Sequence, residues 1–411
     1  MSDSLAKAYP KKSIPYGWVL VGVAFAMYTV TSAIQNAFGI FVLPLQETFG
    51  WSRATISWAM TIHMVVYGLG MVPTGWAMDR INTRLLFGTA AVLVGIGLVL
   101  CSRISQPWQL YLLYGLPLGI GISICGPVLV AIIIRWISKN RGLALGISSA
   151  GVGFGMLIGA PLNNWLIATY GWRNTYVILG IVYFFILLGC AYFFKSSRPP
   201  AAVSEDTLSA KPGNKPPRIV GSTLKQAVLS RQILFLLLAH GAVLFSLRIN
   251  TVHIVPQAID NGISPSVAAL AAGVIGGVSI IGKLVMGYVQ DHIGAPRSMV
   301  ICMLIQGASM LVLPFIGGSN ALFFMYAIAF GFTYGGDIPQ TPAISAGLFG
   351  LLAIGTIYGF VSMAGNLIGA LGPIAAGYVF DLTGSYTLIL LGSVLYLFMA
   401  TFLVSRLKLK Y

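Results

Sequence analysis

Long apolar runs recur along the whole of this 411-residue chain. A helical run of about twenty residues crosses the hydrocarbon core of a bilayer, which is about 30 Å thick. A β-barrel would instead need short segments of alternating polarity, and the sequence shows no such pattern. We therefore predict an all-α membrane protein with twelve transmembrane helices, at 17–45, 54–77, 84–103, 108–134, 142–168, 174–194, 232–258, 265–289, 298–316, 320–346, 353–379 and 386–405.

The composition excludes a soluble protein. Hydrophobic residues make up 57% of the chain, charged residues 8%, and the mean hydropathy is +0.88. Soluble domains carry about a quarter charged residues, so this chain cannot build a water-facing surface. Its 49 glycines fit a helical bundle in lipid, because small residues let helices approach closely where apolar surface alone gives no driving force.

The net charge of +15 is unevenly placed along the chain. If the N-terminus is cytoplasmic, 19 of the 24 Lys and Arg residues lie on the cytoplasmic side of the predicted helices. Three lie on the opposite side, and two, Arg248 and Lys283, lie inside segments. By the positive-inside rule we expect a multi-pass membrane protein with both termini cytoplasmic. We expect the membrane to be the cell inner membrane. The expected partner of the chain is thus a lipid bilayer, and not nucleic acid.

One polar stretch divides the predicted helices six and six. Residues 196–231 are rich in Pro, Ser and Lys, which is typical of a linker without a packed core. We predict an N-terminal six-helix half at 1–195, a cytoplasmic linker at 196–231 and a C-terminal six-helix half at 232–411.

Both halves repeat one signature in the loop after their second helix. It reads G-x-x-x-D-[R/H]-x-x-x-R, with one extra residue before the last Arg in the second copy, and begins at Gly75 and at Gly287. It resembles the loop motif of the major facilitator superfamily. We expect the Asp at the helix end to pair with Arg across the loop and to latch one conformation; the alternative is a charge cluster that only sets topology. The gating candidates are Asp79, Arg80, Arg84, Asp291 and Arg297.

Two further stretches resemble particular families within this superfamily. Residues 37–53 and 135–155 are similar to the end of the first helix and to the fourth-to-fifth helix signature of monocarboxylate transporters and oxalate:formate antiporters. The chain looks most like a bacterial relative of the monocarboxylate transporters. The resemblance implies two parallel halves with substrate bound between them near mid-membrane. It also places Asn36, Lys283 and Ser279 where that family often has Lys, Arg and Asp.

Ionisable side chains inside predicted helices are candidates for function, because burying a charge in lipid is costly. We single out four, all in the C-terminal half: Arg248, His253, Lys283 and Asp337. With His253 neutral their net charge is +1, which suits one bound carboxylate. Protonation of Asp337 would raise it to +2, so substrate and proton uptake would be coupled.

Each of these residues also has a structural interpretation. Lys283 is the expected anion anchor, or it extends to the cytoplasmic surface. Asp337 is either the proton carrier or the ion-pair partner of Arg248. Arg248 is a second contact for the anion, the ion-pair partner of Asp337, or both in alternation. His253 either binds substrate and titrates near neutral pH or is satisfied by a neighbouring helix.

Two polar candidates without a formal charge complete the predicted site. Tyr334 shares a helix face with Asp337, and its hydroxyl either hydrogen-bonds there or packs. Asn36 belongs to a polar group in the first helix, most of which helix-packing hydrogen bonds explain.

The predicted function is secondary active transport of a small, lactate-like organic monocarboxylate with protons, by alternating access. An exchanger of oxalate- or formate-type anions is the alternative. A receptor would need a signalling domain, and none is present in the sequence. An enzyme is not expected, because no nucleotide loop, metal cluster or catalytic triad is present; no cofactor is expected either. The sequence leaves an ancillary subunit open.

The predicted topology can be tested by labelling. In intact cells, a membrane-impermeant thiol reagent should not reach a cysteine introduced by Ala210→Cys, because the linker is expected in the cytoplasm. Permeabilised cells should label, and the parent chain reports the background of the four native cysteines. Labelling in intact cells would overturn the assignment of every loop.

Overall fold

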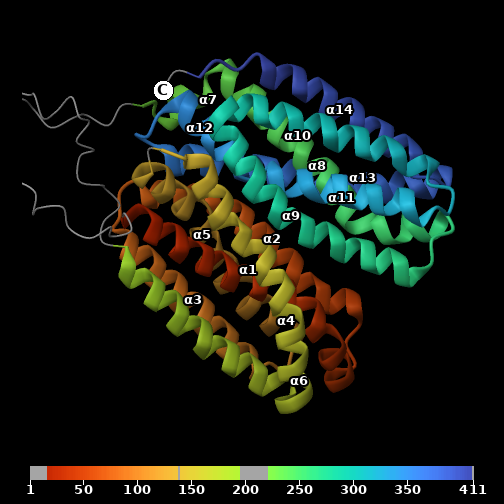
Figure 1. Ribbon diagram of the computed structural model, residues 1–411. Coiled ribbons are helices and arrows are strands. Elements are labelled where there is room, and N and C mark those ends of the chain that lie inside the picture. Colours follow the sequence, from red (N-terminus) through yellow and green to blue (C-terminus); the bar gives the residue numbers. More distant parts are fainter. Residues whose placement is uncertain (1–15, 138, 195–220, 410–411) are drawn as a thin grey trace, which may run out of the picture.

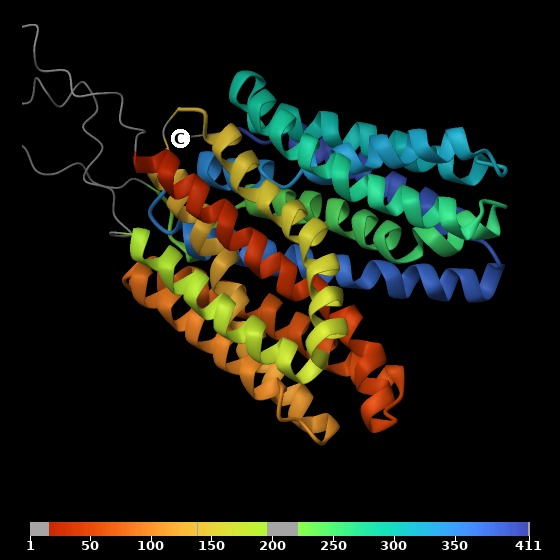
Figure 2. The same cartoon turned by 60° about the horizontal axis from the view of Figure 1, so that its bottom comes forward.

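The computed structural model describes residues 16–137, 139–194 and 221–409, and it is helical almost throughout (Figure 1). In that part of the chain, eleven helical segments are long and apolar enough to cross a membrane. One of them, α6 (Arg141–Phe193), has 53 residues and leaves helical geometry at Gly171, where φ is +74°. Glycine tolerates this conformation because it lacks a Cβ. The chain reverses there (Figure 2), so α6 makes two crossings, and the prediction of twelve transmembrane helices is confirmed.

The N-terminal half follows the predicted order closely. Its fourth crossing, 107–136, is built from a short helix, one π-helical turn and a longer helix, all continuous with one another. The helices of this half are α1 (Tyr16–Phe49), α2 (Arg53–Met78), α3 (Thr83–Cys101), α4 (Pro107–Leu110), η1 (Tyr111–Gly115), α5 (Leu116–Trp136) and α6.

In the C-terminal half, the predicted segment 320–346 is divided into two helices. The break lies at residues 337–339, where Pro339 lacks the backbone N–H that a continuous helix requires. The short α7 (Leu224–Val228) precedes this half. Its helices are α8 (Arg231–Asp260), α9 (Pro265–Ile293), α10 (Ala295–Val312), η3 (Leu313–Phe315), α11 (Asn320–Gly336), α12 (Gln340–Phe349), α13 (Ile354–Thr383) and α14 (Thr387–Ser405).

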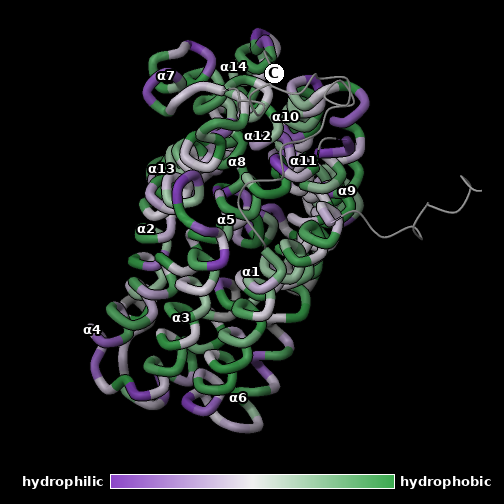
Figure 3. Tube along the Cα trace, turned by 90° about the vertical axis from the view of Figure 1, so that its left-hand side faces the viewer, coloured by the Kyte–Doolittle hydropathy of each residue, from purple (hydrophilic) through white to green (hydrophobic). Residues whose placement is uncertain are grey.

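Each half has its own hydrophobic core. One core is built from side chains between Leu20 and Phe194, joined by Ala346 and Ile354, and the other from side chains between Ala227 and Leu407. Large apolar side chains are also exposed on the outside of both bundles. Hydrophobic residues extend along the helices and hydrophilic residues gather mainly at their ends (Figure 3). This arrangement fits a protein surrounded by lipid.

Glycines hold the two halves together at one end of the molecule. Contacts between the halves are made where α6 meets α9 and where α2 meets α13. A Cβ on Gly142 would overlap the carbonyl oxygen of Gly287, and a Cβ on Gly75 would overlap that of Gly355. Backbones approach this closely only without side chains. Away from this end, where Phe194 and Gly221 lie, the bundles diverge (Figure 2).

We expect Gly142→Ala and Gly75→Ala each to destabilise this closed arrangement by about 1–3 kcal/mol, because overpacking forces the backbones apart. The thermal unfolding midpoint in detergent measures the effect. Gly189→Ala is the matched control, since a Cβ there meets nothing within 4 Å. A midpoint as high as that of the control in both variants would contradict the packing argument.

Candidate functional site

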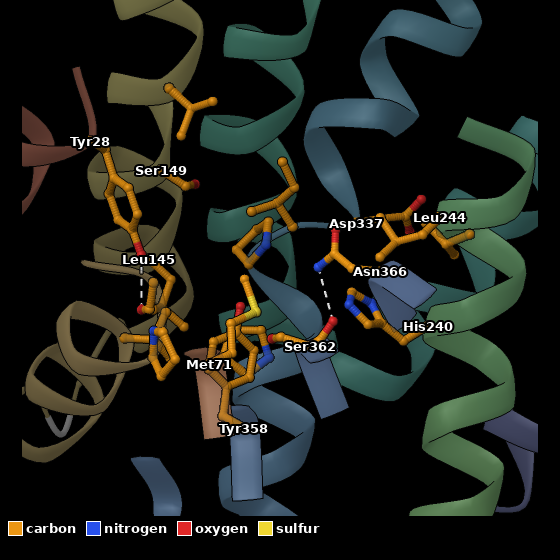
Figure 4. A pocket seen from close by; sticks show the side chains of 18 of the residues that line it. Tyr28, Met71, Leu145, Ser149, His240, Leu244, Asp337, Tyr358, Ser362 and Asn366 are labelled. Carbon is orange, nitrogen blue, oxygen red and sulfur yellow. Dashed lines mark hydrogen bonds between the residues drawn. The ribbon is translucent and has the colours of Figure 1, made fainter. Parts of the chain in front are cut away.

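A cavity of about 250 Å³ lies between the two halves (Figure 4). Its walls come from α1, α2, α5 and α6 on one side, and from α8, α11, α12 and α13 on the other. The polar lining residues are Tyr28, Tyr67, Ser148 and Ser149 in the N-terminal half, and His240, Arg248, Tyr334, Asp337, Tyr358, Ser362 and Asn366 in the C-terminal half.

The N-terminal wall carries no charged lining side chain in the described part of the chain. Met71, Val130, Leu145 and Val152 make it largely apolar. Tyr28 stands there with its hydroxyl donating to the carbonyl oxygen of Gly126 at 3.3 Å. Apolar walls with a few placed polar groups are typical of small-molecule sites.

Arg248 and Asp337 both line the C-terminal wall but do not form the predicted ion pair. The ion pair found among the described residues is between Arg135 and Asp79, elsewhere in the molecule. Asp337 is 3% exposed, and neither of its carboxylate oxygens has a hydrogen-bond partner in the described part of the chain. A partly buried guanidinium and a buried carboxylate therefore line the same cavity without forming an ion pair with each other, an arrangement that costs free energy unless a ligand or proton completes it.

The break after α11 places Asp337 at the cavity. A Cβ on Gly335 would overlap the carbonyl oxygen of Ser279, so the end of α11 lies directly against α9. The chain then turns through Ile338 and Pro339, both of which line the cavity, before α12 begins at Gln340. Tyr334 lines the same cavity one turn before Asp337.

Lys283, the predicted anion anchor, lies outside the cavity lining. Its side chain is 1% exposed, so the interpretation that it extends to the cytoplasmic surface is wrong. The ammonium group donates to the Oγ of Ser279 at 3.3 Å and lies 5.5 Å from the centre of the Tyr334 ring. Tyr334 thus lines the cavity and also contacts Lys283, because its ring forms a cation–π interaction with the ammonium group.

His253 also lies outside the cavity. Its Nδ1 is 3.2 Å from the hydroxyl of Tyr386, and its Nε2 is 3.1 Å from the carbonyl oxygen of Pro373. Both ring nitrogens are therefore occupied by neighbouring helices, which favours the structural interpretation. Asn36 belongs to α1, but its side chain is outside the described residues.

The sequence argument overlooked two histidines within the predicted helices. His240 lines the cavity, and its Nδ1 is 3.1 Å from the Oγ1 of Thr341 in α12. His63 is fully buried in the N-terminal half, where its Nε2 is 3.3 Å from the Nε2 of Gln35. Both were visible in the sequence as ionisable residues inside apolar segments, and the rule that selected His253 selects them equally.

The loop aspartates join the two halves, and do not pair with the loop arginines as expected. Asp79 accepts from Nη2 of Arg135 at 2.6 Å, and from the backbone N–H and the hydroxyl of Thr356 at 3.1 and 2.6 Å. Asp291 accepts from the backbone N–H groups of Gly142 and Leu143 at 2.7 and 2.9 Å. Each carboxylate therefore caps the N-terminus of a helix in the opposite half, where the helix dipole favours negative charge.

The loop arginines have other contacts. Arg80 lies over the ring of Trp76 at 4.5 Å. Arg84 donates to the carbonyl oxygens of Phe194 and Tyr192 within its own half, at 2.7 and 3.2 Å. Arg297 is exposed. Of the five gating candidates, the two aspartates thus make the contacts between the halves.

Comparison with known proteins identifies the family. The sequence profile of the Major Facilitator Superfamily matches residues 20–259 and 248–410. The chain belongs to the major facilitator superfamily. Its fold matches the crystal structure of the superfamily transporter FucP in the outward conformation with a TM-score of 0.72, at 15% identity, covering 95% of this chain and 99% of FucP.

Sequence relatives within the superfamily are transporters. Monocarboxylate transporter 13 of Rattus norvegicus is 28% identical over 375 residues, which cover 90% of this chain and 84% of that protein. The uncharacterized MFS-type transporter YcxA of Bacillus subtilis (strain 168) is 29% identical over 381 residues, covering 90% of each chain. This major facilitator protein is accordingly an integral, multi-pass membrane transporter homologous to monocarboxylate transporters, and not an enzyme.

Proposed function

We propose that this transporter carries a small, lactate-like organic monocarboxylate together with a proton, by alternating access. The observation that carries the proposal is the guanidinium of Arg248, which lines the cavity between the two halves and has no ion-pair partner in the described part of the chain. A carboxylate is the natural partner of such a group, because charge-assisted hydrogen bonds from Arg are strong and fix orientation. The homology to monocarboxylate transporters supports the same chemistry.

We assign the role of anion anchor to Arg248, whereas the sequence argument gave this role to Lys283. Lys283 contributes positive potential from behind the Tyr334 ring and comes closer to substrate only if that ring moves. One cation therefore faces the cavity directly. This favours a monocarboxylate over the oxalate-type dianion of the exchanger alternative, which would need a second cation in direct contact.

Asp337 is the proposed proton carrier. It is the carboxylate among the lining residues, and its oxygens have no hydrogen-bond partner among the residues that the structure describes. Binding a substrate anion at Arg248 adds negative charge to the cavity, which favours protonation of Asp337. By linkage, protonation then tightens anion binding equally.

The contacts at the closed end support the proposal of alternating access. The glycine crossings and the helix caps made by Asp79 and Asp291 close the end at which Phe194 and Gly221 lie. We place this end in the cytoplasm, in accord with the basic residues of the loops. The cavity then opens toward the outside of the cell inner membrane, and the opposite state requires these contacts to separate.

Arg248→Gln should lower the affinity for lactate-like acids by about one to two decades, since a lost charge-assisted hydrogen bond costs roughly 1.5–3 kcal/mol. Arg248→Lys should keep part of the affinity, because the charge remains without the planar fork. Lys283→Gln should cost less than Arg248→Gln. Titration of the purified protein by thermal shift measures all three. If Lys283→Gln loses more affinity than Arg248→Gln, then Lys283 and not Arg248 is the anion anchor.

Asp337→Asn should bind substrate with little pH dependence, because it mimics the protonated carboxyl group. In proteoliposomes, wild-type uptake should rise as the external pH falls. The variant should lose proton-driven accumulation and retain exchange. His253→Gln is the comparison variant and should behave as wild type. If Asp337→Asn still accumulates substrate and His253→Gln does not, the proton belongs to His253.

A further inference from the structure

Three polar side chains gather on the C-terminal wall of the cavity, on the side away from Tyr28 (Figure 4). They are His240 from α8, Asp337 from the break after α11, and Asn366 from α13, and we call them the polar cluster. Three separate elements thus deliver hydrogen-bonding groups to one part of a cavity whose opposite wall is largely apolar.

The polar cluster has hydrogen-bonding capacity to spare. Both oxygens of Asp337 lack a partner. His240 is held through Nδ1 by Thr341, and among the described residues no hydrogen bond is made to its Nε2. Asn366 donates from Nδ2 to the carbonyl oxygen of Ser362 at 2.9 Å. Buried polar groups are nearly always paired in native proteins, so unpaired ones that face a cavity point to a ligand.

The backbone makes room for the histidine. A Cβ on Gly365 would overlap the imidazole ring of His240, so the ring packs directly against α13. Together with the bond to Thr341, this contact fixes the ring between α12 and α13. His240 is therefore a positioned group of the cavity wall.

The polar cluster is separated from the proposed carboxylate site. His240 and Arg248 lie on the same face of α8, eight residues apart, which is about 12 Å along a helix axis. In lactate the hydroxyl lies on the carbon next to the carboxylate, so its two polar ends are much closer together than these two backbone positions.

We propose that the polar cluster is a second subsite, which binds a hydroxyl group at the far end of the transported carboxylate. This inference rests on the proposed function, with Arg248 at the carboxylate. A hydroxyl both donates and accepts, so it pairs with Asp337 in either protonation state and with His240 in either tautomer. The substrate class is then an ω-hydroxy monocarboxylate, with its methylene chain against the apolar N-terminal wall.

The size of the cavity agrees with such a substrate. Its volume is about 250 Å³. That space leaves room beyond the carboxylate for a chain of several carbons.

The test uses the full-length purified protein and three acids of equal chain length. These are hexanoate, 2-hydroxyhexanoate and 6-hydroxyhexanoate, with lactate as the short reference. The two hydroxy acids are isomers, so they differ in where the hydroxyl lies. We expect 6-hydroxyhexanoate to bind about three- to tenfold more tightly than either of the other six-carbon acids, which is the effect of one added neutral hydrogen bond.

Two variants assign the preference to the polar cluster. His240→Phe keeps a ring without hydrogen-bonding atoms, and Asn366→Ala is a second variant in case the first does not fold. Each should bring the affinity ratio of 6-hydroxyhexanoate to hexanoate close to one. His292→Phe, an exposed histidine of the same half, is the matched control and should keep the wild-type ratio.

The possible outcomes separate this inference from the proposed function. If all the acids bind but the two hydroxy isomers bind equally, the second subsite is refuted and the monocarboxylate transporter stands. A preference that survives both His240→Phe and Asn366→Ala also refutes it. If none of the acids binds, the proposed function fails and the inference fails with it.

Discussion

Close approach of helix backbones at glycine is the constraint on which the rest of this structure depends. In lipid, apolar surface does not drive helices together, so association relies on packing and on short polar contacts. At Gly142–Gly287 and Gly75–Gly355 the backbones of opposite halves touch, and this brings two separate bundles into register. These crossings close one end of the cavity between the halves.

The aspartates beside these crossings add contacts between the halves that can form and break. Asp79 and Asp291 each cap a helix of the opposite half, and both contacts lie at the surface end of the bundles, where water can replace them. A contact of this kind stabilises one conformation by a modest amount and is lost when the halves separate. The two caps are related by the repeat of the loop motif, so one sequence signature supplies both sides of the closure.

Inside the cavity the charged groups are not paired in the way that Asp79 and Asp291 are. Arg248 and Asp337 face the same space without pairing, and Lys283 is kept behind Tyr334. An ion pair between Arg248 and Asp337 would satisfy both groups and leave little reason to bind an anion. Keeping them apart leaves each available, as the proposed transport of a carboxylate with a proton requires.

The sequence by itself determined the membrane, the twelve crossings and the superfamily, because lipid demands long apolar helices and the loop motif recurs at a fixed place in each half. It also selected Arg248, Tyr334 and Asp337, since a polar group inside an apolar helix is conspicuous in a single sequence. Only the tertiary structure decided which of these residues share a cavity. Lys283 and His253 met the same sequence criterion as Arg248, yet helix rotation and depth placed one behind Tyr334 and the other between Pro373 and Tyr386. The partner of Asp79 was likewise undetermined, because Arg135 and Thr356 come from distant segments that only packing brings together.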